Sequence, residues 1–293
     1  MTADVFALHR GLLFTVAYEM LGSASDAEDV VQEAWLRWAN VDRSTVRDPR
    51  AYLVRIVTRQ ALNRLRTVAR RREDYVGEWL PEPLATGPDV AADIELVENV
   101  SMAMLTVLET LAPTERAVFV LREVFDTPYD EIAAAVGKTP AAVRQVAHRA
   151  REHVAARRPR VQVSRDEQER AVARFLDALQ SGDPGRLLDV LAPDVVLVSD
   201  GGGVVPSVRR PIEGAQTVAR LLSRFTTEAP GARVRIVLLN GAPAARIDVE
   251  GVAPTTVTVV VSLVAEGGRI SRIYAVANPE KLARLDTETL LTR

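Results

Sequence analysis

Residues 127–152 constrain the fold more than any other stretch of this chain, because they predict two short helices joined by a tight turn. Thr127 and Asp130 have the spacing of a capping box, and Pro128 suits the first helical position. An apolar face follows, and Gly137 supplies the turn. A strand does not fit this pattern, so we expect a helical hairpin here.

The second helix of this pair carries the side chains that suit a DNA groove. Thr139 can cap it, and Pro140 opens it. One side is apolar, and the other side is polar or basic. The apolar positions are Val143, Ala147, Ala150 and Val154, and the outward positions are Arg144, Gln145 and His148. This pattern predicts a helix-turn-helix, although capped helix pairs with exposed arginines also occur in all-α domains that bind no nucleic acid.

Charge around the second helix favours a surface that faces phosphates. Glu152 is the only acid between Lys138 and Arg160. Lys138 and Thr139 suit phosphate contacts at the helix start. Base edges or neighbouring phosphates are in reach of a further set: Arg144, Gln145, His148 and Arg149. His148 fits equally well as a phosphate contact or an ordinary surface residue.

Residues 5–72 have helical periodicity throughout, and two helices stand out. Ser25 and Glu28 have capping-box spacing at the start of the first. Its apolar side holds Val30, Val31, Ala34, Trp35 and Trp38, and its outer side holds Asp26, Asp29, Gln32 and Glu33. The second helix, 51–72, has a core stripe of Leu53, Ile56, Val57, Ala61 and Leu65. Its other face is basic, with Arg55, Arg59, Asn63, Arg66 and Arg70.

Breaks in the periodicity predict four parts: residues 1–72, a linker at 73–98, a helical part at 99–160 and a last domain at 161–293. The linker contains the bulky apolar run WLPEPL at 79–84, which a flexible spacer does not need, so we expect it to dock. After a helix capped by Ser164 and Glu167, β-branched runs appear at 195–198, 234–239, 244–249, 255–264 and 270–276, with a helix at about 215–225 between them. This order predicts an α+β domain with a curved antiparallel sheet.

Composition excludes several classes of site. The chain has no cysteine, so it has no disulfide, no thiolate metal site and no cysteine nucleophile. Its longest apolar run is far below the length that spans a membrane, and no signal peptide is evident. We therefore expect no metal, no cofactor and no membrane contact.

The helical blocks resemble bacterial sigma factors of the extracytoplasmic-function type. The match rests on DAEDVVQEAWLRW at 26–38, on AYLVRIVTRQALNRLR at 51–66, and on the helix-turn-helix block at 99–158. The resemblance implies that Asp29, Gln32 and Glu33 bind core RNA polymerase. It also implies that Arg55, Arg59, Asn63 and Arg66 line the promoter −10 element, and that the helix-turn-helix reads the −35 element. A cytoplasmic protein with core polymerase and promoter DNA as partners follows from this resemblance.

The last domain resembles the cone-shaped SnoaL-like fold, which a subgroup of these sigma factors carries as a fused extension. Three signatures of that subgroup are WLPEPL, DGGG and NPEKL, although Val204 and Val205 follow the glycines where a basic residue is expected. The resemblance implies that the extension regulates the sigma factor in cis. The residues of this interface would be Trp79, Leu80, Pro81, Glu82, Pro83, Leu84, Asp200, Gly201, Gly202, Gly203, Asn278, Pro279, Glu280, Lys281 and Leu282.

Two other functions remain open at this point. One is a free-standing helix-turn-helix regulator whose last domain senses a small ligand. The other is a fused isomerase-like enzyme, since relatives of the cone fold include isomerases. Against catalysis, all three histidines lie outside the last domain, and Asp200 precedes three glycines, which is typical of a turn. We therefore expect no enzyme activity.

Overall fold

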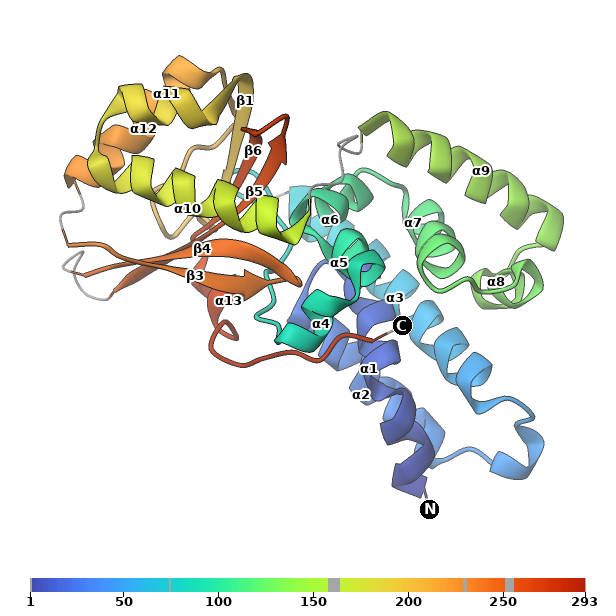
Figure 1. Ribbon diagram of the computed structural model, residues 1–293. Coiled ribbons are helices and arrows are strands. Elements are labelled where there is room, and N and C mark those ends of the chain that lie inside the picture. The colour runs from blue at the N-terminus through green and yellow to red at the C-terminus, as the bar shows by residue number, and fades with distance from the viewer. Residues whose placement is uncertain (1, 74, 158–163, 229–230, 251–255, 293) are drawn as a thin grey trace. The chain divides into compact units, whose positions relative to one another are not determined.

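The computed structural model describes residues 2–73, 75–157, 164–228, 231–250 and 256–292. The chain forms two compact units (Figure 1). The helical unit comprises residues 1–74, 93–158 and 290–293, and the α+β unit comprises residues 75–92 and 159–289. The segment predicted as a linker is therefore divided, because residues 75–92 belong with the C-terminal domain.

The helical unit is built from two groups of helices. The first group is α1 (Thr2–Leu21), α2 (Ala24–Ala39), the short 3₁₀ turn η1 (Arg43–Thr45) and α3 (Pro49–Glu73). The second group is α5 (Ile94–Val100), α6 (Met102–Glu109), α7 (Pro113–Phe119), the π-helical turn η2 (Val120–Val124), α8 (Tyr129–Val136) and α9 (Pro140–Arg157). α1 packs on α2 and α3, α7 packs on α9, and α3 also packs on α7 and α8.

The predicted helix faces are confirmed. In α3 all five stripe residues are buried, and in α9 the four apolar positions from Val143 to Val154 are buried. In α2 four of the five predicted positions are buried, while Trp35 is half-buried with its ring 5.1 Å from that of Phe6. Hydrophobic periodicity therefore assigns the inner face of each of these helices correctly.

Two predicted caps are wrong, and two are confirmed. α2 begins at Ala24, so Ser23, not Ser25, accepts from the Asp26 amide (3.3 Å). Thr127 is buried and makes no cap, because the chain leaves η2 through Asp126 at φ +45° and reaches α8 through Pro128.

At the turn between α8 and α9, Gly137 ends α8 at φ +70°, and Thr139 accepts from the Ala142 amide (3.2 Å), as predicted. The helix-turn-helix prediction is thus right although its first cap is wrong.

The predicted linker also contains helices. α4 (Pro88–Ala92) lies inside it, and α5 begins at Ile94, before the expected boundary at residue 98. The Asp93 carboxylate accepts from the Leu96 amide (3.0 Å), and this cap starts α5 early. Pro88 opens α4 because its fixed backbone angle suits a first helical position.

The α+β unit contains α4, α10 (Arg165–Ser181), α11 (Pro184–Val190), α12 (Ala215–Glu228), α13 (Pro279–Leu282) and one sheet. Its strands are β1 (Leu191–Asp200), β2 (Ile212–Glu213), β3 (Arg233–Leu239), β4 (Ala242–Val249), β5 (Val257–Glu266) and β6 (Arg269–Val276). The strand order is β2-β1-β6-β5-β4-β3. The α+β class is confirmed, as are the five predicted strands over their described residues, and the Ser164–Glu167 capping box forms.

The sheet is mixed, which corrects the antiparallel prediction. β1 pairs with β6 in parallel, while the other neighbours are antiparallel. The physical reason is that the chain after β1 passes through β2, α12 and the β3–β6 meander before β6 returns beside β1. Parallel pairing places the carboxyl ends of β1 and β6 at the same edge of the sheet.

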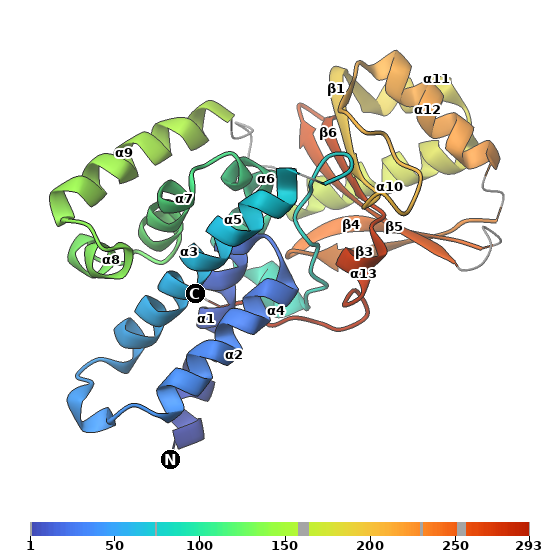
Figure 2. The same cartoon turned by 180° about the vertical axis from the view of Figure 1, so that it is seen from behind.

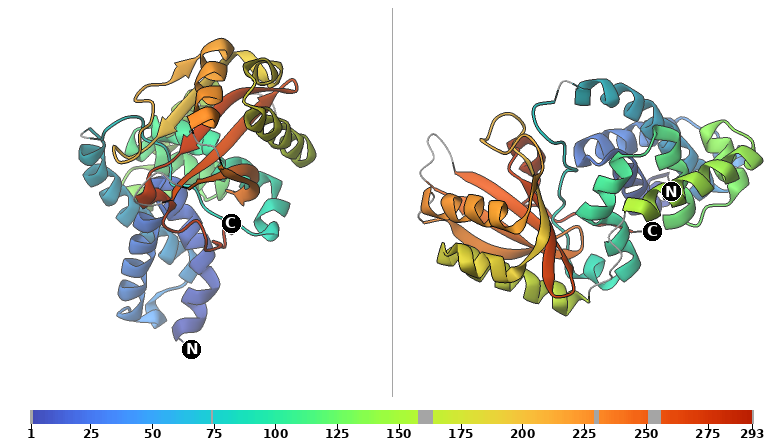
Figure 3. Two further views of the ribbon diagram at one scale, coloured as in Figure 1. Left: turned by 90° about the vertical axis from the view of Figure 1, so that its left-hand side faces the viewer. Right: turned by 90° about the horizontal axis from the view of Figure 1, so that it is seen from above.

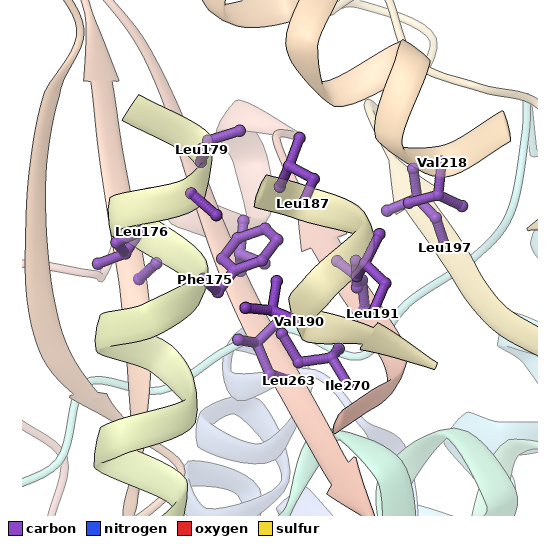
Figure 4. Close-up of a cluster of buried hydrophobic side chains, with 14 of the residues drawn as sticks. Phe175, Leu176, Leu179, Leu187, Val190, Leu191, Leu197, Val218, Leu263 and Ile270 are labelled. Carbon is purple, nitrogen blue, oxygen red and sulfur yellow. The ribbon is translucent and has the colours of Figure 1, made fainter. Parts of the chain in front are cut away.

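The core of this unit lies between the sheet and the helices α10, α11 and α12, which cover one face of it (Figure 3). Phe175 and Leu179 of α10 point toward Leu187 and Val190 of α11, whereas Leu176 lies on the other side of α10 (Figure 4). Leu263 and Ile270 meet them from β5 and β6. Buried apolar side chains therefore fill the space between helices and strands. Among the described residues, no helix is long and apolar enough to cross a bilayer.

Candidate functional sites

Asp200 lies at the carboxyl end of β1, in register with Val276 at the end of β6. The amides of Ala277 and Asn278 both donate to the Asp200 carbonyl, at 2.7 and 3.1 Å. Parallel pairing of the two strands therefore brings DGGG and NPEKL, which are far apart in sequence, to one edge of the sheet.

The Asp200 carboxylate is buried and accepts four hydrogen bonds. Oδ1 accepts from the Tyr75 hydroxyl (2.5 Å) and the Gly202 amide (3.0 Å). Oδ2 accepts from the Leu80 amide (2.9 Å) and the Lys281 ammonium (2.6 Å). Two of the four donors belong to segment 75–86, so this carboxylate binds that segment to the domain. Hydrogen bonds to an ionised group are the stronger ones, each worth about 1.5–3 kcal/mol.

Lys281 completes the same centre from α13. The Lys281 side chain is 6% exposed and the Asp200 side chain is 0% exposed. The Lys281 ammonium also donates to the Leu80 carbonyl (2.5 Å) and lies 3.2 Å from the centroid of the Trp79 ring. The cation is thus paired, hydrogen-bonded and stacked against an aromatic face, which are the conditions under which a buried charge is tolerated.

Tyr75 links the centre to Asn278. The Asn278 amide nitrogen donates to the Tyr75 oxygen (2.8 Å), and that hydroxyl donates to Asp200. Burial and the neighbouring Asp200 carboxylate raise the pKa of the Tyr75 hydroxyl above its ordinary value, so Tyr75 remains a donor at neutral pH. Asn278 also caps α13 by accepting from the Glu280 amide (3.0 Å).

The glycines after Asp200 allow two close approaches. Gly202 has φ +65°, and a Cβ there would lie 2.5 Å from the Asn278 amide group. Gly203 has φ +72°, and a Cβ there would lie 3.2 Å from the Val76 side chain. Gly201 is crowded by the Val205 carbonyl. A larger residue at Gly202 would displace the cap of α13, and one at Gly203 would press on the start of segment 75–86.

A second anchor holds the other end of segment 75–86 at the β3–β4 turn. Leu84 donates to the Asn240 side chain (3.0 Å) and accepts from the Asn240 amide (2.8 Å). The Thr86 amide donates to the Leu238 carbonyl (3.1 Å), and Ala85 forms a bridge with Leu239. Only the end of the segment, at Ala85 and Thr86, therefore pairs with the edge strand β3. Figures 1 and 2 view this domain from opposite sides, and they place α10 and the segment on opposite faces of the sheet.

The predicted interface residues of segment 79–84 lie largely inside this surface. Leu80, Pro81, Glu82, Pro83 and Leu84 are buried, and Trp79 is half-buried. In NPEKL, Asn278 and Lys281 are buried, Leu282 is half-buried, and Pro279 and Glu280 are exposed. Sequence reasoning missed Tyr75, Thr86 and Asn240. An aromatic residue beside WLPEPL and an Asn-Gly pair between two strands were the available signals.

The predicted polymerase-binding residues lie on the outer face of α2. Asp29, Gln32 and Glu33 are all exposed. Asp29 forms an ion pair with Arg64 of α3 (3.0 Å), and Arg64 also pairs with Asp26 (2.6 Å). Asp29 is therefore exposed but partly neutralised by a neighbouring helix.

The four predicted −10 residues of α3 are not equivalent. Asn63 and Arg66 are exposed and lie 3.5 Å apart, and the Arg55 guanidinium lies 5.3 Å from the centroid of the Tyr52 ring. Arg59 instead donates to two backbone carbonyls of α8, from Nη2 to Ala134 (2.7 Å) and from Nε to Ala135 (3.3 Å).

The predicted −35 residues lie on the outer side of the helix-turn-helix. The exposed set is Lys138, Thr139, Arg144, Gln145, His148 and Arg149. Two of them contact acids weakly, His148 with Glu152 (3.8 Å) and Arg149 with Glu115 (3.9 Å). These six residues therefore give the start and the outer side of α9 an exposed, mainly basic surface.

Two protein-family models match the chain. Sigma-70 region 2 matches residues 5–72, and Sigma-70 region 4 matches residues 101–154. The first match covers α1 to α3, and the second covers the helix-turn-helix with the helices that support it.

Relatives extend the match to the C-terminal domain. The ECF RNA polymerase sigma factor SigJ of Mycobacterium tuberculosis is 36% identical and aligns over 96% of this chain and 93% of its own length. A probable ECF RNA polymerase sigma factor, SigI of the same species, is 32% identical over 96% of this chain and 94% of its own length. The crystal structure of SigJ matches with a TM-score of 0.80 and 32% identity, covering 98% of this chain and 100% of that one. The chain therefore belongs to the extracytoplasmic-function RNA polymerase sigma factors.

Proposed function

We propose that this sigma factor directs promoter-specific initiation under the control of its own C-terminal domain, which acts by binding segment 75–86. The observation that carries the proposal is the buried Asp200 carboxylate, which accepts from both the Tyr75 side chain and the Leu80 backbone.

The sigma regions supply the binding surfaces. The exposed acids of α2 support binding to core RNA polymerase, since basic partner helices are attracted to such a face. The arginines of α3 support contacts to the −10 strand, and the outer face of α9 supports contacts to the −35 duplex. The protein would therefore act in the cytoplasm, where polymerase and promoter are found.

Control through segment 75–86 follows from its place in the chain. It lies in the covalent connection between α3, which ends at Glu73, and α5, which begins at Ile94. The 20 residues from 74 to 93 could span at most about 70 Å when fully extended. With 75–86 bound, its two ends are held at a fixed separation, and only the residues outside it can extend. Binding thus restricts the distances at which the two regions can engage DNA together.

Spacer length between the two promoter elements tests this proposal. Transcription by core polymerase with the full-length chain would be measured on promoters whose −35 and −10 elements are moved apart by single base pairs. Trp79→Ala removes the aromatic face that covers the Lys281 ammonium, so we expect it to release the segment and broaden the range of accepted spacers. Arg284→Ala, an exposed change just beyond α13, is the matched control and should keep the wild-type range.

Two results would count against the proposal. In one, Trp79→Ala and wild type give identical spacer profiles although hydrogen exchange shows that residues 75–86 are released. Binding of segment 75–86 would then not restrict the accepted spacers. Tight sequence-specific binding to duplex DNA without core polymerase, and no transcripts with it, would instead favour a free-standing regulator.

A further inference from the structure

Asn240 and Gly241 form the turn between β3 and β4, and they are the one place in the chain where glycine follows asparagine. Both have positive φ, +53° for Asn240 and +75° for Gly241, which suits a two-residue hairpin turn. Glycine has no Cβ to shield its backbone nitrogen. That nitrogen can therefore attack the Cγ of the preceding asparagine, which is the first step of deamidation.

Segment 75–86 holds both reacting groups of this pair. The Gly241 amide donates to the Thr86 hydroxyl (2.8 Å), so the nitrogen that would attack is hydrogen-bonded. The Asn240 side-chain oxygen accepts from the Leu84 amide (3.0 Å), and the Asn240 backbone amide donates to the Leu84 carbonyl (2.8 Å). Cyclisation requires the asparagine side chain to turn toward the next amide, so these bonds must break first.

Burial also keeps solvent away from the pair. Gly241 is buried, and Asn240 is 1% exposed beneath Leu84 and Thr86, which are 1% and 4% exposed. The Gly241 nitrogen must lose its proton to a base in the solvent before it can attack. A buried, hydrogen-bonded N–H reaches solvent only after a local opening. The bound segment therefore protects the pair, and release of the segment exposes it.

We propose that Asn240 is a deamidation site controlled by segment 75–86, so that release of the segment leads to conversion of Asn240 to isoaspartate or aspartate. This inference rests on the release of segment 75–86 proposed above. The Gly241 nitrogen forms a bond to the Asn240 Cγ, the bond from Cγ to the side-chain nitrogen breaks, and ammonia leaves. Water then opens the cyclic imide. Opening at the backbone carbonyl gives isoaspartate, and opening at the side-chain carbonyl gives aspartate.

Either product weakens the anchor at the β3–β4 turn. Isoaspartate adds a methylene group to the backbone of the turn, beside the pairing of Leu239 with Ala242. Aspartate places a negative charge at a position that is 1% exposed, and burial of a charge is costly. Loss of ammonia makes the reaction irreversible. Deamidation would therefore turn a reversible release of the segment into a lasting one.

Incubation of the full-length chain in water enriched in heavy oxygen tests the proposal, because opening of the imide places that oxygen in the product. Trypsin cuts after Arg235 and Arg246, and peptide 236–246 contains one asparagine and no glutamine. The mass of this peptide therefore reports Asn240 alone. The chain unfolded in urea gives the rate of the unprotected pair. We expect the folded wild type to react at least about tenfold more slowly, since local opening must come first.

Two substitutions at Thr86 form a matched pair. Thr86→Val removes the hydroxyl that accepts from Gly241 and keeps the shape of the side chain. It should accelerate deamidation about two- to tenfold, which is the effect of one lost hydrogen bond. Thr86→Ser keeps the hydroxyl and should react at the wild-type rate. Trp79→Ala, which is expected to release the segment, should react at a rate close to that of the unfolded chain.

Hydrogen exchange of the Leu84 amide in the same samples separates this inference from the function on which it rests. Release of the segment in Trp79→Ala with deamidation at the wild-type rate would overturn the inference and leave the proposed control of transcription intact. A folded wild type that reacts as fast as the unfolded chain would overturn it too, as would equal rates for Thr86→Val and Thr86→Ser. Should Trp79→Ala keep its Leu84 amide protected, the two Thr86 variants decide.

Discussion

Each of the two compact units buries an acid beside a base, and the two pairs differ in how many hydrogen bonds the acid accepts. In the α+β unit, both oxygens of Asp200 are used, by two donors each. In the helical unit, neither carboxylate oxygen of Glu19 has a hydrogen-bond partner among the described residues. Arg116 donates to the backbone carbonyl of Glu19 and pairs with Glu109 (2.9 Å) instead.

This difference decides how strongly each buried pair stabilises the contact that it makes. A buried charge whose lone pairs are all satisfied holds its donors in place, and losing one partner is costly. A buried carboxylate without donors is kept neutral by taking up a proton. Burial raises the pKa of the Glu19 carboxyl to about 8, because nearby Arg116 offsets only part of the desolvation. The Asp200 pair therefore suits a specific bound state, and the Glu19 pair suits a contact that can be given up.

The largest effect is expected when the satisfied pair is broken. Asp200→Ala leaves the Lys281 ammonium buried without its carboxylate, and loss of one partner of a buried pair costs about 3–5 kcal/mol. We expect residues 75–86 to leave the domain, which hydrogen exchange of the Leu80 and Leu84 amides would detect as lost protection. The melting temperature of the α+β unit should fall as well.

A double variant sharpens this result. Lys281→Met keeps the volume of the side chain and removes its charge, so adding it to Asp200→Ala should cost much less than Lys281→Met alone. Equal costs in both backgrounds would mean that the two side chains act independently. The Asp200–Lys281 pair would then be no more strongly coupled than Glu19 and Arg116.

The buried Glu19 carboxyl can be tested through the pH dependence of stability. Below pH 4.5 the folded and unfolded states both hold the proton; between 4.5 and about 8 only the folded state holds it. The free energy of unfolding should therefore fall as pH rises through this window, by at most about 1.4 kcal/mol per pH unit. Glu19→Gln removes the titration and keeps the shape, so it should be more stable than wild type at pH 8 and less sensitive to pH. Denaturant melts of both chains from pH 5 to 9 measure this, and parallel curves would contradict an unsatisfied Glu19.

The helices and their buried faces could be predicted from the sequence far better than the two buried acid–base pairs. Periodicity assigns the buried faces of α2, α3 and α9, because each face repeats along one local segment. Glu19 ends an apolar run and would ordinarily mark its exposed end, yet it is 0% exposed, because helices from a distant part of the chain cover it. Asp200 before three glycines indicates a turn, which it does form, but its burial depends on β1 returning beside β6. Contacts between segments that are far apart in the chain leave no periodic pattern in the local sequence, so periodicity cannot predict them.

The same reason explains what the site prediction left out. DGGG, WLPEPL and NPEKL were identified by resemblance, and their residues meet at one edge of the sheet. Tyr75 and Asn240 lie outside those signatures, and each contributes through a contact more than 120 residues away in sequence. Arg59 was assigned to DNA on its helix face alone, since nothing local shows that α8 ends beside it.

The smallest effect is expected when only one of the four hydrogen-bond donors to Asp200 is removed. Tyr75→Phe removes one hydrogen bond to Asp200 and the acceptor of the Asn278 amide nitrogen, while Leu80, Gly202 and Lys281 still satisfy the carboxylate. The cost should be about 1–2 kcal/mol, below that of Asp200→Ala. Hydrogen exchange should then show faster opening at residues 75–80 with continued protection at 84–86, where Asn240 and Leu238 hold the backbone. Uniform loss across 75–86 would mean that the segment binds as one cooperative unit, and that the two anchors cannot be released separately.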